Sequence, residues 1–251
     1  MKPVISCDSV NDVVVERCEG VAGELVLRRG AHLDVIANGT FLISTANEAS
    51  SRAMVSAGLQ RVRAGGVDVL IGGLGMGYAL DEALGSKACR RVVVAELEPT
   101  IVRWFREVGG DRAEALAEAE ECGRAEIVVC DVAEYLAAHP NSFDLVSLDT
   151  DNGPEWLVRD ENEGLYARQG IALTAATLRS GGIAVFWSPE RYADFESRLR
   201  ATFADVQLVP AVDVIDGVAH EYTMYVGLRR EADTNTAVEW SAVVGGEGGT
   251  L

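Results

Sequence analysis

The stretch that decides the fold is residues 67–96, VDVLIGGLGMGYALDEALGSKACRRVVVAE. Its first five residues, Val67 to Ile71, are mostly apolar and β-branched, which predicts a short strand buried on both faces. Residues 78–84 then read as a helix, and residues 92–95 read as a second buried strand that is followed by Glu96. Between the first strand and the helix stand four glycines, Gly72, Gly73, Gly75 and Gly77.

The order strand, glycine-rich turn, helix, strand and acid is the pattern of a site that binds a nucleoside. Glycines allow a tight turn and let a ligand approach the backbone N–H groups closely. An acid at the end of the second strand accepts hydrogen bonds from both ribose hydroxyls, and Glu96 stands 19 residues after Gly77, near the usual spacing of about 20. The glycines follow GGxGxG rather than GxGxxG, and NAD and S-adenosylmethionine (AdoMet) both fit at this stage. A plain strand-to-helix turn with a surface glutamate is the alternative interpretation.

Composition limits the classes of partner that the chain can have. The 251 residues suffice for one large domain or one domain with a small appendage, and 48% of them are hydrophobic. The formal net charge of −17 repels phosphate backbones, so we expect no nucleic-acid partner. No run of about 18 apolar residues is present and MKPVISCDSV at the start has no signal-peptide pattern, so we expect no membrane span and a cytoplasmic protein.

The cysteines predict neither a metal site nor a disulfide framework. They are Cys7, Cys18, Cys89, Cys122 and Cys130; their number is odd, and no two of them form a CxxC pair. We therefore expect no metal ion, and a reducing cytoplasm is the simplest compartment.

The patterns divide the chain into three parts. Residues 1–45 contain short apolar runs separated by turn signals, with Asn38-Gly39 as a strong hairpin signal, and predict a small N-terminal β-subdomain. Residues 46–230 alternate between strand and helix patterns and predict the nucleoside-binding α/β domain. Residues 231–251 are rich in Gly, Thr and Glu and read as a loose C-terminal tail.

The alternation of strands and helices predicts an α/β fold, with a seven-stranded, mostly parallel, doubly wound sheet. The strands after the opening stretch are expected at residues 126–130, 143–148, 183–187, 206–212 and 221–228. A short turn at Asp216-Gly217 joins the last two, which predicts an antiparallel hairpin at the edge of the sheet. A helix over about residues 163–179 is expected to end at Gly181-Gly182.

Acids stand at the ends of the second, third and fourth strands of this sheet. Asp131 follows the third strand, and Asp149 and Asp151 follow the fourth. The ligand of such a sheet binds beyond the carboxyl ends of the strands. We therefore expect the glycine turn, Glu96 and these aspartates to converge on one site.

Five stretches resemble the spermidine synthase family, a branch of the AdoMet-dependent methyltransferase-like fold. They are IGGLGMG (71–77), AELEP (95–99), CDVAEYL (130–136), LDTDNGP (148–154) and GLYARQGIALTAATLRSGGIAVFWSPE (164–190). The resemblance extends from about residue 13 to residue 228. It implies an N-terminal β-subdomain, an AdoMet-binding domain with a seven-stranded core, and assembly into a homodimer or homotetramer.

The resemblance also implies roles for individual residues. Glu96 would hold the ribose hydroxyls, Asp131 would accept a hydrogen bond from the adenine amino group, and Val132 would lie beside the adenine ring. Asp149 would be the active-site acid near the sulfonium and the acceptor, and Asp151 is the nearest counterpart of the family's second aspartate. The donor-binding turn would consist of Gly72, Gly73, Gly75 and Gly77.

The chain departs from the family's pattern where the family binds an aminopropyl group. Gly75 stands where the family has an aspartate that pairs with the ammonium of decarboxylated AdoMet, and Leu42 replaces a donor-binding glutamine. Ser51, Arg52 and Ala53 align with the family's YHE-like trio. An ammonium removed from water needs a carboxylate partner, whereas the carboxylate of AdoMet prefers backbone N–H groups or a cation. Arg52 would oppose the ammonium if it faces the pocket, so the sequence favours intact AdoMet.

The sequence therefore predicts an AdoMet-dependent transferase that methylates a small-molecule acceptor. Asp149 is the candidate base, or the anchor of a cationic amine, and Asp151 is a second candidate. The residues expected to wall the acceptor pocket, each equally compatible with plain packing, are Trp156, Tyr166, Trp187 and Ser188. The alternatives are an aminopropyltransferase that uses decarboxylated AdoMet and a polyamine acceptor, a non-catalytic nucleoside-binding protein and, more distantly, an NAD-dependent reductase.

Overall fold

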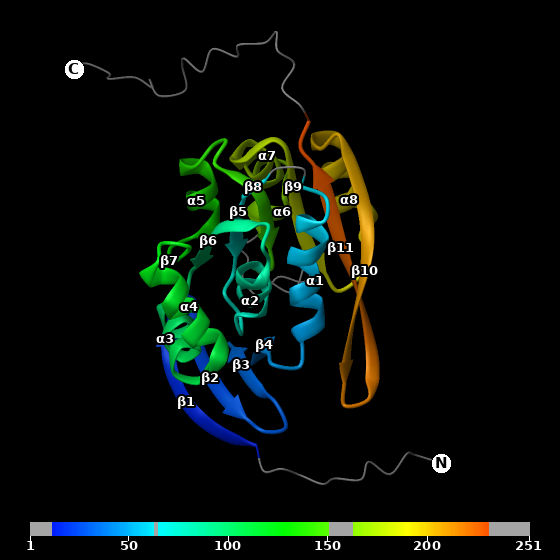
Figure 1. Cartoon of the computed structure of the whole chain (residues 1–251). Helices are drawn as coiled ribbons and strands as arrows, with labels where there is room; N and C mark the ends of the chain where they lie inside the picture. The colour runs from blue at the N-terminus through cyan, green and yellow to red at the C-terminus, as the bar shows by residue number, and fades with distance from the viewer. Residues whose placement is uncertain (1–11, 63–64, 151–162, 231–251) are drawn as a thin grey trace, which may run out of the picture.

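The computed structural model describes residues 12–62, 65–150 and 163–230 and contains two β-sheets (Figure 1). The N-terminal sheet consists of β1 (Val13–Gly20), β2 (Gly23–Arg29), β3 (Leu33–Ala37) and β4 (Thr40–Ser44). The core sheet consists of β5 (Val67–Gly72), β6 (Cys89–Glu96), β7 (Ala125–Val129), β8 (Phe143–Leu148), β9 (Leu178–Ser188), β10 (Asp205–Ile215) and β11 (Val218–Leu228). The helices are α1 (Glu48–Leu59), α2 (Tyr78–Gly85), α3 (Pro99–Val108), α4 (Asp111–Glu121), α5 (Val132–Ala138), α6 (Glu163–Tyr166), α7 (Arg168–Thr177) and α8 (Ala193–Thr202).

The core sheet has the strand order β10-β11-β9-β8-β5-β6-β7. Strands β9, β8, β5, β6 and β7 run parallel, whereas β11 is antiparallel to both β9 and β10. The predicted α/β fold with a seven-stranded, mostly parallel sheet and an antiparallel hairpin at its edge is confirmed. Strand β5 lies within the sheet and is buried along its whole length, which explains its continuous apolar run.

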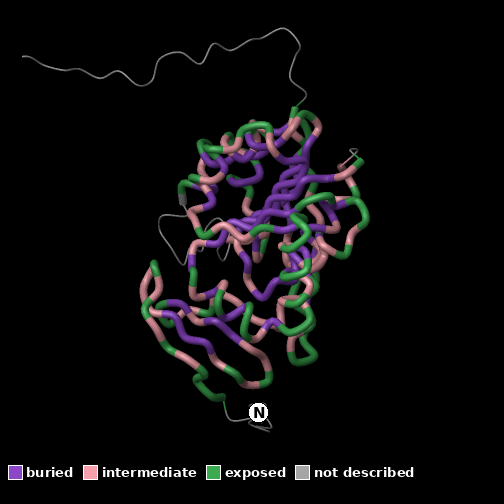
Figure 2. The backbone as a smooth tube through the Cα atoms, turned by 60° about the vertical axis from the view of Figure 1, so that its left-hand side comes forward, coloured by how far each residue is buried: buried purple, intermediate pink, exposed green. Residues whose placement is uncertain are grey.

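Helices cover both faces of the core sheet, and the buried residues concentrate between them (Figures 1 and 2). Helices α1 to α4 contribute to one apolar cluster, which includes Val69 and Ile71 of β5. Helices α5 to α8 contribute to a second cluster, which includes Leu70 of β5 and Phe186 of β9. Successive side chains of a strand point to opposite faces, so β5 supplies both clusters.

The N-terminal sheet is antiparallel, with its strands in chain order. Asn38 and Gly39 join β3 to β4 with φ angles of 50° and 79°, which confirms the predicted hairpin. The apolar side chains of Leu25, Leu27, Val35 and Ala37 pack against Met76, Tyr78 and Trp104. Because Met76 belongs to the glycine turn and Trp104 to α3, this sheet lies over the carboxyl ends of the neighbouring core strands.

The segment before β9 differs from the expected single helix over residues 163–179. The chain forms the short helix α6, then α7, and enters β9 at Leu178, so the two glycines of Gly181-Gly182 lie inside the strand. A Cβ on Gly182 would approach the carbonyl oxygen of Asp144 in the neighbouring strand β8 to 3.1 Å. The glycine therefore permits close contact between strands rather than ending a helix.

The hairpin of β10 and β11 is longer than its apolar pattern predicts. Its strands remain paired up to Ile215 and Val218, and the hairpin extends beyond the rest of the core sheet (Figure 1). At its tip the Asp216 carboxylate lies 3.6 Å from Nε2 of His32, which belongs to the turn between β2 and β3. In the described ranges, none of the helices combines the length and the apolar character that crossing a bilayer requires.

Candidate functional site

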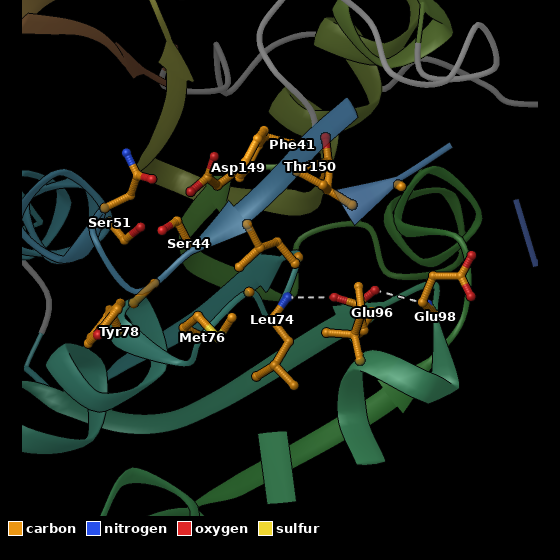
Figure 3. Close-up of a pocket in the computed structure, with 18 of the residues that line it drawn as sticks. Phe41, Ser44, Ser51, Leu74, Met76, Tyr78, Glu96, Glu98, Asp149 and Thr150 are labelled. Carbon is orange, nitrogen blue, oxygen red and sulfur yellow. Dashed lines mark hydrogen bonds between the residues drawn. The ribbon is translucent and has the colours of Figure 1, made fainter. Parts of the chain in front are cut away.

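A cavity of about 580 Å³ opens between the carboxyl ends of the core strands and the N-terminal sheet (Figure 3). The ends of four core strands contribute to its lining: Gly73 follows β5, Glu96 ends β6, Asp131 follows β7 and Asp149 follows β8. These residues are far apart in the sequence and meet here because parallel strands end at the same edge of the sheet. The other walls come mainly from β2, β3, β4 and the start of α1.

The glycine turn after β5 follows the cavity wall. Gly73 has a φ angle of 89°, and a Cβ at this position would lie 2.5 Å from the carbonyl oxygen of Asp149, so a larger residue does not fit. Gly75 has a φ angle of 56°, but a Cβ there would meet only Ile43 Cγ2, at 3.9 Å. The cavity therefore has room for a side chain at position 75. Two further glycines, Gly72 and Gly77, stand outside the lining.

Glu96 fastens the glycine turn to the end of β6 (Figure 3). Its Oε2 accepts a hydrogen bond from the backbone N–H of Leu74 at 2.7 Å, and its Oε1 accepts one from Glu98 N–H at 2.9 Å. Burial raises the pKa of Glu96, against these backbone hydrogen bonds, which lower it. A carboxylate has about four acceptor positions, so Glu96 retains capacity to accept hydrogen bonds from a ligand's hydroxyl groups.

Asp131 and Val132 line the cavity beside the end of β7. Asp131 is the N-cap of α5, and its Oδ1 accepts a hydrogen bond from Ala133 N–H at 2.7 Å. The cap fixes the carboxylate at the cavity edge, while Val132 offers a largely buried apolar surface next to it. An acceptor beside an apolar face suits the amino edge and the ring of a planar base.

Asp149 lies in the cavity wall, close to Ser44 and Ser51 (Figure 3). Burial raises the pKa of Asp149 to about 6; a hydrogen bond with the Ser51 side chain lowers it, and the charge of Asp213 raises it. A base acts most effectively when its pKa lies near the working pH. Asp149 is therefore mostly ionised at neutral pH and suited to accept a proton there.

Asp213 is a buried acid that sequence reasoning missed. It belongs to β10, is 1% exposed, and its Oδ1 accepts hydrogen bonds from Ala49 N–H at 2.7 Å and Ser50 N–H at 3.0 Å at the start of α1. Its Oδ2 has no hydrogen-bond partner among the described residues. Asp213 thus holds the helix that carries Ser51, and it adds negative charge next to Asp149.

The other predicted site residues are divided between the cavity and the core. Trp187 lines the cavity and packs on Tyr222, with 5.0 Å between ring centroids. Ser188 is buried, donates a hydrogen bond to the Glu190 carbonyl oxygen at 2.7 Å and is not part of the lining. Tyr166 is also outside the lining, and its ring packs against that of Phe195 in α8. Asp151 and Trp156 lie outside the described residues.

The charges in the cavity wall are predominantly negative. The acids that line it are Asp34, Glu96, Glu98, Asp131, Asp149 and Asp216, against Arg28 and His32. Arg28 pairs with Asp34 at 2.8 Å, and His32 lies beside Asp216. In the ranges that the structure describes, no cationic side chain pairs with any of the other four acids. The cavity therefore favours a ligand that carries positive charge.

Arg52 does not line the cavity. Its guanidinium pairs with Asp81 at 2.7 Å and with Glu48 at 2.9 Å, between α1 and α2. The expectation that Arg52 would oppose an ammonium required this side chain to face the pocket, and it does not. Within the described part of the chain, no three His, Cys, Asp or Glu side chains are grouped in a way that would hold a metal ion.

No protein-family model matches the chain, but curated proteins do. It is 32% identical over 120 residues to polyamine aminopropyltransferase 2 of Pseudomonas aeruginosa, across 46% of this chain and 32% of that protein. It is 28% identical over 142 residues to the polyamine aminopropyltransferase of Thermoanaerobacter sp. strain X514, across 55% of this chain and 47% of that protein. The matched segments thus span about a third to a half of these relatives' lengths.

Solved structures show the same fold. A spermidine synthase in complex with the transition state analogue AdoDATO superposes with a TM-score of 0.72 at 14% identity, over 86% of this chain and 73% of that chain. The spermidine synthase of Thermotoga maritima gives a TM-score of 0.68 at 14% identity, over 86% of this chain and 72% of that chain. Together with the curated relatives, these likenesses confirm the resemblance to the spermidine synthase-like family and its methyltransferase-like fold.

Proposed function

We propose that this protein is a transferase that moves an aminopropyl group from decarboxylated AdoMet to an amine acceptor, such as a polyamine. The observation that carries the proposal is the acidic cavity at the carboxyl ends of the core strands, where Glu96, Asp131 and Asp149 stand without a cationic partner among the described residues. Both the sulfonium donor and the amine acceptor are cations, so this wall attracts both. The curated relatives named polyamine aminopropyltransferases support the same reaction class.

In this reaction the cavity residues bind, orient and accept a proton. Glu96 and Asp131 hold the nucleoside by its hydroxyl and amino groups. Asp149 orients the acceptor nitrogen and takes the proton that leaves it as the new C–N bond forms and the C–S bond breaks, with the electron pair passing to sulfur. The products are the alkylated amine and methylthioadenosine. Alignment of nucleophile and electrophile provides most of the rate, because the sulfonium is already an activated electrophile.

Methyl transfer from AdoMet, which the sequence alone favours, is the second candidate. The observation in its favour is Gly75, which leaves the donor end of the cavity without the aspartate that the spermidine synthase pattern has there. Against it, Arg28 and His32 are the cavity's basic side chains, and each already has an acidic neighbour. The carboxylate of AdoMet would thus meet a mostly acidic wall.

The products distinguish the two reactions. Purified protein is incubated with decarboxylated AdoMet or AdoMet and a series of mono-, di- and triamines, and the products are identified by mass spectrometry. We expect methylthioadenosine and an aminopropylated amine, and little S-adenosylhomocysteine. S-adenosylhomocysteine as the main product would establish methyl transfer instead. Tight nucleoside binding with no turnover of either donor would establish the non-catalytic alternative.

Assembly, localisation and the division into parts stay predictions. The homodimer or homotetramer that the family resemblance implies is checked by light scattering of the purified protein. The boundaries at residues 45 and 230 are checked by limited proteolysis, which should cut near them before it cuts within the core sheet. The cytoplasmic localisation is checked by fractionation of cells that express the tagged chain.

A further inference from the structure

Glu98 is a buried carboxylate that joins the cavity wall to the N-terminal sheet (Figure 3). Its Oε2 accepts a hydrogen bond from Val21 N–H at 2.8 Å, and its Oε1 accepts one from Ala22 N–H at 2.9 Å. Only 5% of Glu98 is exposed. One side chain from the segment between β6 and α3 therefore holds two neighbouring N–H groups of the turn between β1 and β2.

The same segment connects this turn to Glu96. The N–H of Glu98 donates to Oε1 of Glu96, whose Oε2 accepts from Leu74 N–H. A continuous chain of hydrogen bonds thus runs from the β1–β2 turn through two buried carboxylates to the glycine turn after β5. Displacing the turn would leave buried N–H groups and carboxylate oxygens of this chain without partners, which is costly, so the chain resists the displacement.

The β1–β2 turn lies unusually close to Glu98. A Cβ on Gly20 would come within 2.6 Å of Glu98 Oε2 and within 2.7 Å of Leu25 Cδ1, so a larger residue here would displace these two side chains. Ala22 and Leu25 also line the cavity. Ala22 is hydrogen-bonded to Glu98, whose N–H is hydrogen-bonded to Glu96, so the turn and Glu96 belong to adjoining parts of the cavity wall.

We propose that Glu98 is a positioning residue for the donor's nucleoside. It fixes the β1–β2 turn as an apolar wall beside Glu96, so that the nucleoside is held between the core sheet and the N-terminal sheet. The inference rests on the proposed function for the identity of that nucleoside. It makes this side of the N-terminal sheet a fixed part of the binding site, not a unit that closes over the ligand.

Glu16 of β1 provides a matched control. It fastens the same N-terminal sheet to α3, because it accepts hydrogen bonds from Arg103 at 2.6 Å and from Trp104 Nε1 at 2.9 Å. Glu16 does not line the cavity. Glu16→Gln thus weakens the attachment of the sheet without touching the wall next to Glu96.

The test is a calorimetric titration with 5′-methylthioadenosine, which carries the nucleoside and lacks the aminopropyl group. In Glu98→Gln an amide NH₂ group replaces one carboxylate oxygen, so one of the two backbone N–H groups faces a donor and loses its hydrogen bond. We therefore expect nucleoside affinity to fall about tenfold or more. Glu98→Asp, which keeps the charge but shortens the side chain, should also weaken binding. Glu16→Gln weakens a partly exposed ion pair, so it should lower Tm by less than the Glu98 variants and leave Kd within about twofold of the wild-type value.

The possible results distinguish a failure of the inference about Glu98 from a failure of the proposed function. Glu98 variants that bind as tightly as the wild type, or a Glu16 variant that loses as much affinity as Glu98→Gln, overturn the inference alone. If Glu98→Gln does not fold, Glu98→Asp decides by the same comparison with Glu16→Gln. A wild-type protein that binds no adenine nucleoside overturns the proposed function, and the inference falls with it.

Discussion

Buried acids lie at both ends of the core sheet, but their interaction partners differ. At the amino end, Asp68 of β5 and Asp144 of β8 are each the second residue of their strand, and Arg179 of β9 bonds to them at 2.9 Å and 2.7 Å. Arg90 of β6 also pairs with Asp68. At the carboxyl end, Glu96, Asp131 and Asp149 accept hydrogen bonds from backbone N–H groups or a hydroxyl and, in the described ranges, pair with no cation.

The difference separates acids that stabilise the fold from acids that are available to a ligand. A buried carboxylate is costly unless it is paired, so the arginines at the amino end complete a structural network. At the carboxyl end the uncompensated charge remains, and the pKa of Asp149 is raised to about 6. Acids with a perturbed pKa in a cavity are candidates for a functional site. The interaction partners of a buried acid therefore indicate its role better than its presence alone does.

Loss of Asp149, which we propose as the base of the reaction, should have the largest effect. We expect Asp149→Asn to lower kcat by a factor on the order of 10² to 10⁴, because the variant cannot accept the proton of the amine. The free energy of unfolding at pH 7 should stay the same or rise. Asp149 has a folded-state pKa of about 6, above its unfolded value of about 3.9, so its contribution to stability is present at low pH and lost as the pH rises through 6.

Steady-state kinetics and chemical denaturation of the same preparation measure both quantities. A variant that loses stability but keeps kcat would contradict the assignment of Asp149. It would place Asp149 among the structural acids, with those at the opposite end of the sheet.

The reverse result is expected for Asp144. Asp144→Asn removes a charge that pairs with Arg179 and leaves that guanidinium and Asp68 N–H with a weaker acceptor. We expect a loss of about 1–3 kcal/mol in the free energy of unfolding, with kcat/KM within about twofold of wild type. Urea denaturation followed by circular dichroism measures the loss. A drop in kcat/KM comparable to that of Asp149→Asn would remove the distinction between the two ends.

The sequence predicts the positions of these acids because they depend on local patterns. Glu96, Asp131 and Asp149 each follow a short apolar run, and parallel strands bring such ends together in any doubly wound sheet. The antiparallel hairpin at the sheet edge and the N-terminal hairpin follow from the same kind of local information. The exact ends of β9 and the β10–β11 hairpin do not, because they depend on contacts with neighbouring strands.

The residues that the sequence does not reveal act across long separations. Asp213 caps α1 from 163 residues away, and Glu98 holds Val21 from 77 residues away. The sequence offers one signal for Asp213, which is an acid within the strand pattern VPAVDVI. An acid at such a position is ordinarily expected to be exposed. Arg52 shows the same limit in its ion pair with Asp81 of α2, whereas its pair with Glu48 is local to α1.

An acid introduced at the donor end should make the cavity discriminate more strongly between the two donors. Gly75→Asp fits the space at this position and its φ angle of 56°, which aspartate tolerates better than most residues. We expect about tenfold tighter binding of decarboxylated AdoMet, equivalent to about 1.4 kcal/mol, because the new carboxylate pairs with the ammonium. Binding of AdoMet, measured in parallel by calorimetry, should weaken because of its carboxylate. Equal changes for both donors would show that position 75 does not face the donor's terminal group.

The smallest expected effect concerns the pH profile. Asp149 accepts a proton only when ionised, so kcat should fall as the pH drops through about 6. Asp213→Asn keeps an Oδ1 acceptor for α1 and removes the neighbouring charge, which lowers the pKa of Asp149 and moves this acid limb to lower pH. The pH dependence of kcat measures the shift. Asp205→Asn, an exposed acid at the start of the same strand, should leave the limb in place. A limb that moves in both variants, or in neither, would mean that Asp213 only caps the helix and does not tune the base.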